Sequence, residues 1–139
     1  MKTILVPVDL SEATVKVCDA ACSLAKLLKA RLVLLHVVQP PPVIISDYYG
    51  YDAGVIAEAM GSAEKFATDK LRALGQRYAK RRVTVRTVQR TGQPLPTILT
   101  KASVLNADYI VIGSHGHTAA YDLLIGSVTQ GVLRKASCP

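Results

Sequence analysis

Apolar positions along the chain follow two alternating patterns, unbroken runs and runs with helical spacing. Residues 3–8 (TILVPV) and 31–38 (RLVLLHVV) are nearly continuous apolar segments, a pattern typical of strands covered on both faces of a parallel sheet. Residues 13–30 place apolar side chains three and four positions apart, which predicts a helix with one buried face. Ser11 stands just before it and is predicted to be its N-cap.

The alternation continues through the rest of the chain. Helices are predicted at 54–80, 94–105 and 127–135, and strands at 83–89 and 108–113. Pro94 falls in the first turn of its helix, a position that proline tolerates. Strands that alternate with helices predict an α/β fold, an open parallel sheet with helices on both faces. We expect one domain over residues 1–139, because no linker, repeat or low-complexity tract divides it.

The ends of the predicted strands are where a ligand is expected. In open parallel sheets, ligands bind beyond the carboxyl ends of the strands, where the strand order reverses. Asp9 follows the first strand, Val37 lies near the end of the second, and the stretch GSHGHTAAYDLLIGS (113–127) begins where the last strand ends. Pro7 cannot donate a ladder hydrogen bond, but it stands where the first strand leaves the sheet.

Three glycines in the 113–127 stretch suggest a phosphate site. Bare backbone after a strand lets amide groups converge on an anion. Gly126 and Ser127 open a predicted helix, and helix N-terminal amides favour phosphate. The phosphate motifs GxxxxGK[ST] and GxGxxG are absent. Taken singly, each glycine is better explained as a turn or cap residue than as part of a site. Their spacing and location together favour a phosphate site in two parts.

The spacing G-x2-G-x9-G-S is met by Gly113, Gly116, Gly126 and Ser127. Together with KTILVPVDLS, LVLLHVV, TGQPLPTIL and ADYIVIGSHG, it resembles the universal stress protein family, and within it the branch whose members bind ATP. The resemblance runs from Thr3 to Pro139. It implies a five-stranded parallel sheet in the order 3-2-1-4-5 and a homodimer.

The same resemblance implies a nucleotide site for ATP, with ADP or AMP as alternatives, together with Mg²⁺. Asp9 would hold the ribose or the adenine edge, although a helix-capping carboxylate is the alternative role for it. Pro7 and Val8 would line the base, and Val37 would offer backbone hydrogen bonds to adenine. The phosphates and ribose would be surrounded by Gly113, Ser114, Gly116, Gly126, Ser127, Val128 and Thr129.

Charge and cysteine content add limits. The formal net charge of +7 fits polyanions, acidic lipid surfaces and phosphate-bearing small molecules equally well. A basic series borders the third strand, at Arg77, Lys80, Arg81, Arg82, Arg86 and Arg90. It is interpreted as a solvated face, because nucleic acid binding needs base-stacking aromatics and only Tyr78 stands among these charges. Cys18 and Cys22 are interpreted as buried side chains rather than metal ligands.

Neither a signal peptide nor an apolar stretch of membrane-spanning length is recognised. With an odd number of cysteines, this predicts a cytoplasmic protein without membrane insertion. His36 is predicted to be structural and Asp108 to cap or turn the chain. His115 and His117 are expected to lie partly solvated near phosphate rather than to bind a metal. The loop 39–54 is either a lid or partner surface over the pocket, or an irregular surface loop.

Members of the family usually continue past the Cys138–Pro139 pair into a final strand that pairs with a second subunit. The given sequence stops at Pro139, so strand five is missing from it and we expect a weakened or rearranged dimer. Three functions stand: a regulatory ATP-binding protein of the stress response, read by a protein partner; a slow ATPase or self-phosphorylating protein; and an interaction module with an empty or AMP-occupied pocket. The first is favoured, because no general base or arginine finger is recognised.

Overall fold

The computed structural model describes residues 1–41, 53–114 and 125–139, in which strands and helices alternate as predicted. The strands are β1 (Thr3–Pro7), β2 (Arg31–Val38), β3 (Val85–Thr91) and β4 (Tyr109–Ile110). The helices are α1 (Ala13–Leu28), α2 (Ala53–Ala79), α3 (Pro94–Val104) and α4 (Ser127–Lys135). The α/β fold class is confirmed. The predicted loop 39–54 falls largely outside the described residues.

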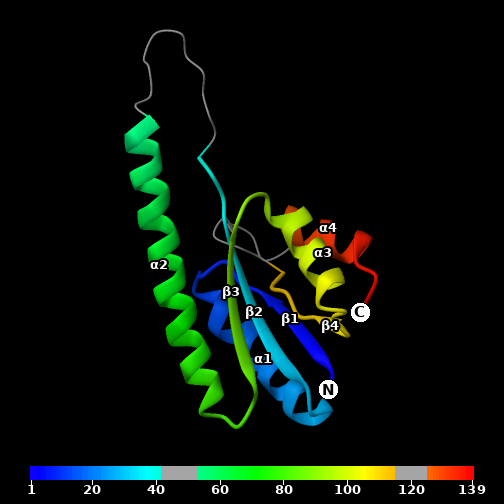
Figure 1. Ribbon diagram of the computed structural model, residues 1–139. Coiled ribbons are helices and arrows are strands. Elements are labelled where there is room, and N and C mark those ends of the chain that lie inside the picture. Colours follow the sequence, from blue (N-terminus) through cyan, green and yellow to red (C-terminus); the bar gives the residue numbers. More distant parts are fainter. Residues whose placement is uncertain (42–52, 115–124) are drawn as a thin grey trace.

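The four strands form one parallel sheet in the order β3-β2-β1-β4 (Figure 1). This confirms the predicted order 3-2-1-4. From β1 the chain moves to β2 and β3 on one side, and then crosses to β4 on the other. The strand order therefore reverses between β1 and β4, so that this end of the sheet is the expected ligand position.

Helices cover both faces of the sheet, as the continuous apolar runs predict. Ile4 and Val6 of β1 pack in a core with α1 and α2, whereas Leu5 packs in a second core with α3 and α4. All three side chains have an exposed fraction of 0%. Because consecutive strand residues point to opposite faces, both faces of β1 must be apolar, and the sequence ILV satisfies both at once.

Strand β4 is much shorter than the predicted 108–113, and Pro7 gives the physical reason. The peptide groups of odd-numbered β1 residues point toward β4, because the Val111 amide donates to the Leu5 carbonyl at 2.9 Å. Those of even-numbered residues point toward β2, because the Val8 amide donates to the Leu35 carbonyl. The next ladder bond to β4 would need an amide proton on Pro7, which proline lacks. The ladder therefore stops there.

Asp108 ties the starts of β1 and β4 together. Its carboxylate accepts the Thr3 amide at 2.7 Å, and its own amide donates to the Thr3 carbonyl at 2.9 Å. The predicted turning or capping role of Asp108 is confirmed in this form. On its outer side, β4 receives the end of the chain, because the Ile110 amide donates to the Pro139 carbonyl at 2.9 Å.

The prediction that Ser11 caps α1 is wrong. The residue at the N-cap is Glu12, and no side chain caps the helix. The Ser11 hydroxyl is buried without a hydrogen-bond partner in the described residues. The carboxylate of Asp9 stabilises the turn before the helix instead, because it accepts the Ser11 amide at 3.0 Å and the Thr14 hydroxyl at 3.3 Å.

A polar cluster joins α1 to the end of α2. The Tyr78 hydroxyl lies 3.0 Å from Asp19 Oδ1 and 3.2 Å from the Val15 carbonyl, and Arg81 Nη1 lies 2.7 Å from the same Asp19 oxygen. The hydrogen bond from Tyr78, followed by Arg81, lowers the pKa of Asp19. Burial, followed by the bond to Asp19, raises the pKa of Tyr78 to about 12. The cluster therefore holds a neutral phenol against an ionised carboxylate.

Two glycines inside α2 predict opposite responses to alanine. A Cβ atom at Gly61 meets none of the described residues within 4 Å, whereas one at Gly75 would lie 2.8 Å from Thr87 Cγ2. Gly61→Ala is expected to raise the free energy of unfolding by about 1 kcal/mol through helix propensity. Gly75→Ala is expected to gain nothing or to lose stability. Urea unfolding of both variants tests this, and equal stabilisation by the two would contradict it.

Tyr78→Phe is expected to lower the free energy of unfolding at neutral pH. The lowered pKa of Asp19 means that its stabilisation is present above its ordinary pKa of about 4 and is lost as the pH falls through the lowered value. The difference between parent and variant should therefore shrink in acid. Unfolding at a series of pH values measures it, with Tyr109→Phe as the matched control. If the difference in unfolding free energy is independent of pH, the hydrogen bond from Tyr78 does not lower the pKa of Asp19.

Candidate functional site

A pocket of about 760 Å³ opens at the carboxyl ends of β1 and β2. Its walls come from both sides of the sheet: the turn after β1, the end of β2, the segment after β4 and the start of α4, with side chains from the other three helices. The volume falls in the range of roughly 300–1,000 Å³ that is common for small-molecule sites. The pocket thus lies at the predicted reversal of strand order.

Nine of the eleven predicted site residues line this pocket: Pro7, Val8, Asp9, Val37, Gly113, Gly126, Ser127, Val128 and Thr129. Ser114 is not among the lining residues, and its carbonyl accepts the Gly126 amide at 2.8 Å. Gly116, with His115 and His117, lies outside the described residues. Residues from four separate parts of the sequence therefore meet at one place.

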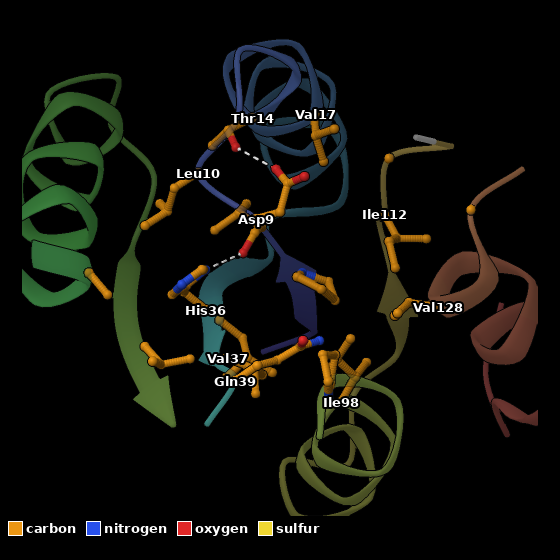
Figure 2. Close-up of a pocket in the computed structure, with 18 of the residues that line it drawn as sticks. Asp9, Leu10, Thr14, Val17, His36, Val37, Gln39, Ile98, Ile112 and Val128 are labelled. Atoms are coloured by element: carbon orange, nitrogen blue, oxygen red, sulfur yellow. Dashed lines mark hydrogen bonds between the residues drawn. The ribbon is translucent and has the colours of Figure 1, made fainter. Parts of the chain in front are cut away.

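Asp9 holds the turn that forms one wall of the pocket. Figure 2 shows its carboxylate directed at Thr14, and the same oxygen accepts the Ser11 amide. Between Asp9 and Ser11, Leu10 adopts the left-handed conformation with φ 63°, which costs free energy for a residue with a side chain. The hydrogen bond across the turn offsets that cost. Asp9 thus stabilises the turn before α1 without capping the helix, and it also lines the pocket.

Val37 presents backbone groups beyond the end of β1. Even-numbered residues of β2 carry the ladder to β3, so the peptide groups of Val37 point to the β1 side. The ladder with β1 ends at Val8, whose amide donates to Leu35 and whose carbonyl lies 2.8 Å from His36 Nδ1. Within the described ranges, the Val37 amide and carbonyl have no ladder partner. A donor and an acceptor are therefore open at the pocket wall.

The start of α4 supplies further open amides. Its N-cap is Gly126 and no side chain caps it. The first intrahelical bond runs from Gln130 to the Gly126 carbonyl, which leaves the amides of Ser127, Val128 and Thr129 without acceptors in the described structure. The Thr129 hydroxyl is committed, since it donates to the Gly113 carbonyl at 2.6 Å. Thr129 can therefore contact an anion only through its amide.

The fold does not require glycine at position 126. Its φ of −59° and ψ of 147° suit any residue. Among the described residues, a Cβ atom there would have the Ser114 carbonyl oxygen as its nearest neighbour, at an ordinary contact distance of 3.6 Å. The absence of a side chain thus keeps the approach to the α4 amides clear without serving the turn itself.

The remaining walls are mostly apolar. In Figure 2, Val37 and Ile98 lie along the lower side of the pocket, and Ile112 and Val128 lie along its right side. His36 also lines the pocket. Because the Val8 carbonyl can only accept, His36 Nδ1 carries a proton and donates it to that carbonyl. The predicted structural role of His36 is confirmed, and its place in the wall was not predicted.

Sequence reasoning missed the contributions of the helices, namely Thr14 and Val17 of α1, Phe66 of α2 and Ile98 of α3. These side chains occupy ordinary apolar positions in their helices. Nothing in the periodicity distinguishes a residue that covers the sheet from one that reaches beyond its end. Thr14 could have been found, because it stands five residues after Asp9, close enough in the chain for its hydroxyl to reach that carboxylate.

The described residues contain neither a metal-binding cluster nor a membrane-spanning helix. No cluster of three or more His, Cys, Asp or Glu side chains is placed to hold a metal ion there. Cys18 and Cys22 are buried in the core beside α2, which confirms their interpretation, and burial raises the pKa of the Cys18 thiol to about 11. None of the helices in these ranges has both the length and the apolar character needed to cross a membrane.

Comparison with known proteins gives a consistent result. The profile of the universal stress protein family matches residues 1–139. Universal stress protein YxiE of Bacillus subtilis (strain 168) is 30% identical over 138 residues, which cover 97% of this chain and 93% of that protein. Universal stress protein UspA from Lactobacillus plantarum superimposes with a TM-score of 0.84 at 29% identity, over 99% of this chain and 93% of that one.

Two more distant structures share the fold. A universal stress protein in complex with cAMP has a TM-score of 0.70 at 22% identity, covering 99% of this chain and 92% of that chain. The universal stress protein from Archaeoglobus fulgidus in complex with dAMP has a TM-score of 0.67 at 21% identity, covering 100% and 94%. With a family profile that spans the whole sequence, this chain belongs to the universal stress protein family.

Proposed function

We propose that this protein binds ATP, or a related adenine nucleotide, in the pocket between the ends of β1, β2 and β4. It acts as a regulatory protein of the stress response, whose nucleotide-bound state is read by a partner protein. Residues 1–139 form one domain for this purpose, and the protein works in the cytoplasm as a homodimer.

The observation that carries the proposal is the open backbone of Val37 at an apolar wall. An adenine edge offers an amino donor next to a ring-nitrogen acceptor, and Val37 supplies one acceptor and one donor. The side chains of Pro7, Ile98 and Ile112 line the same pocket and suit the faces of a purine. Small-molecule sites commonly combine such apolar walls with a few fixed polar groups.

The phosphates are proposed to lie at the N-terminus of α4. The amides of Ser127, Val128 and Thr129 are open there, and the helix dipole adds partial positive charge. Gly113 and Gly126 line the pocket beside these amides. A Mg²⁺ ion would be held mainly by phosphate oxygens and water, because Asp9 is the one carboxylate among the described lining residues.

The related structures in complex with cAMP and dAMP support an adenine nucleotide in this fold. Both ligands carry a single phosphate, so these structures do not distinguish ATP from AMP as the ligand of this protein. Mass spectrometry of nucleotide released from the purified, denatured protein identifies which one is carried.

Gly126→Val is expected to weaken ATP binding at least about tenfold, equivalent to roughly 1.4 kcal/mol, because a branched side chain would block the α4 amides. Adenosine, which lacks phosphate, should be affected much less. Since the fold accepts a Cβ atom at this position, the melting temperature without nucleotide should stay near that of the parent. Calorimetric titration with both ligands measures the effect.

Asp9→Asn serves as the matched variant on the nucleoside side. Asparagine keeps an oxygen for the Ser11 amide but removes the charge, so the binding of ATP and of adenosine should weaken together.

ATP should stabilise the parent by about 2.7 kcal/mol at one hundred times its dissociation constant. Unchanged ATP binding by Gly126→Val would place the phosphates elsewhere and make Gly126 a cap residue only.

Hydrolysis is expected to be far slower than the roughly 1–100 s⁻¹ typical of kinases. Among the described lining residues no lysine or arginine is present, and Asp9 Oδ1 already accepts two hydrogen bonds. Single-turnover assays with labelled ATP and Mg²⁺ measure the rate. Turnover within the kinase range that disappears in Asp9→Asn would favour the enzyme instead.

A further inference from the structure

The outer edge of β3 combines two features that the nucleotide pocket does not use. One is a row of backbone groups without hydrogen-bond partners among the described residues, and the other is a group of cations, of which the two arginines are exposed. Figure 1 shows β3 at the edge of the sheet, with α2 along one side of it and α3 toward the other. We call this edge, with Arg86, Arg90 and Lys101, the β3 edge surface.

The backbone of β3 is half paired. Its even-numbered residues carry the ladder to β2, as the bonds of Thr84 and Gly92 at its two ends show. The peptide groups of the odd-numbered residues therefore point outward. In the described chain, the Thr87 amide, the Thr87 carbonyl and the Gln89 amide have no hydrogen-bond partner. Such an edge accepts an additional strand.

The cations lie on one face of this edge. Arg86 and Arg90 flank Val88, which is buried in the core with α3 and α4, so both arginines point to the α3 side. Both arginines are exposed. Lys101 of α3 lies near them: partial burial lowers its pKa most, and the positive charges of Arg90 and Arg86 lower it further. In the described ranges the two ion pairs are Arg72–Asp69 and Arg81–Asp19. The three cations therefore have no acidic partner there.

We propose that the β3 edge surface docks an extended, acidic segment of a partner protein, which adds to the sheet beside β3. Alternate side chains of an added strand point to the same face. Carboxylates at every second position would therefore face Arg86, Arg90 and Lys101, while the intervening side chains would face α2. This binding does not depend on nucleotide.

Two other occupants fit less well. A second copy of this chain paired antiparallel about Val88 would place Arg86 opposite Arg90, and like charges directly opposite are destabilising. A nucleic acid strand has no peptide groups to continue the regular backbone pairing along the edge. It would also find no stacking partner, because neither β3 nor α3 contains an aromatic residue. Arg90 Nη1 meanwhile donates to the Gln89 carbonyl at 2.8 Å, which covers part of the free edge.

The probe is a labelled peptide of seven residues, the length of β3, with alternating Glu and Val and blocked ends. Fluorescence anisotropy is expected to show binding that weakens as ionic strength rises. The double variant Arg86→Ala with Arg90→Ala should weaken it about tenfold, as expected for the loss of two exposed ion pairs. Arg134→Ala, which removes an exposed charge on α4, should leave it unchanged.

A peptide of the same sequence with alternate amides methylated separates strand addition from simple charge attraction. It keeps every carboxylate but cannot pair along the edge, so its binding should fall at least as far as in the double variant. Equal binding of the two peptides would overturn the proposal, as would absence of binding by the unmodified peptide. A single-stranded oligonucleotide that binds more tightly, and loses binding in the same double variant, would overturn it in favour of nucleic acid. Thermal unfolding confirms that each variant is folded.

Discussion

The missing amide proton of Pro7 determines where the sheet ends and the pocket begins. Pro7 is placed so that its peptide nitrogen faces β4, and without a proton there the ladder between β1 and β4 stops at Val111. The chain then leaves the sheet at Asp9, while the neighbouring strand β2 continues to Val38. The backbone of Val37 is left open on the side that β1 has vacated, and the start of α4 faces the same space. The end of β1 thus leaves both the gap and the open backbone groups of Val37 at its wall.

The rest of the fold keeps this gap fixed. Ile4, Leu5 and Val6 are fully buried between two helical layers, so β1 cannot shift its register without exposing both cores. At the amino end, Asp108 fastens β1 to β4, and the Asp19–Tyr78–Arg81 cluster joins α1 to the C-terminal end of α2. The polar groups of the pocket are therefore held by parts of the molecule that do not line it.

Much of the sheet could be predicted from the sequence, because a strand buried on both faces has a simple signature. RLVLLHVV gave the exact bounds of β2, and the ends of the strands pointed to Asp9 and Val37. The length of β4 could not be predicted in the same way, since the limit is set by Pro7, about one hundred residues earlier in the chain. Nor could the role of Ser11, because Asp9 competes for the same turn and a carboxylate accepts more strongly than a hydroxyl. Phe66 and Ile98 depend on how far α2 and α3 extend past the sheet, a distance that periodicity does not contain.

Gly126 has a consequence for how this protein family can change over time. Its backbone is ordinary, and a methyl group there would touch the Ser114 carbonyl oxygen only at van der Waals distance. Selection for folding alone therefore exerts almost no pressure on this position, in contrast to Gly75, where a side chain would press on Thr87. A lineage that does not use the proposed phosphate site can replace Gly126 without losing the fold, and a descendant can regain the glycine by one substitution. The proposed site can thus be lost and recovered while the scaffold is inherited unchanged.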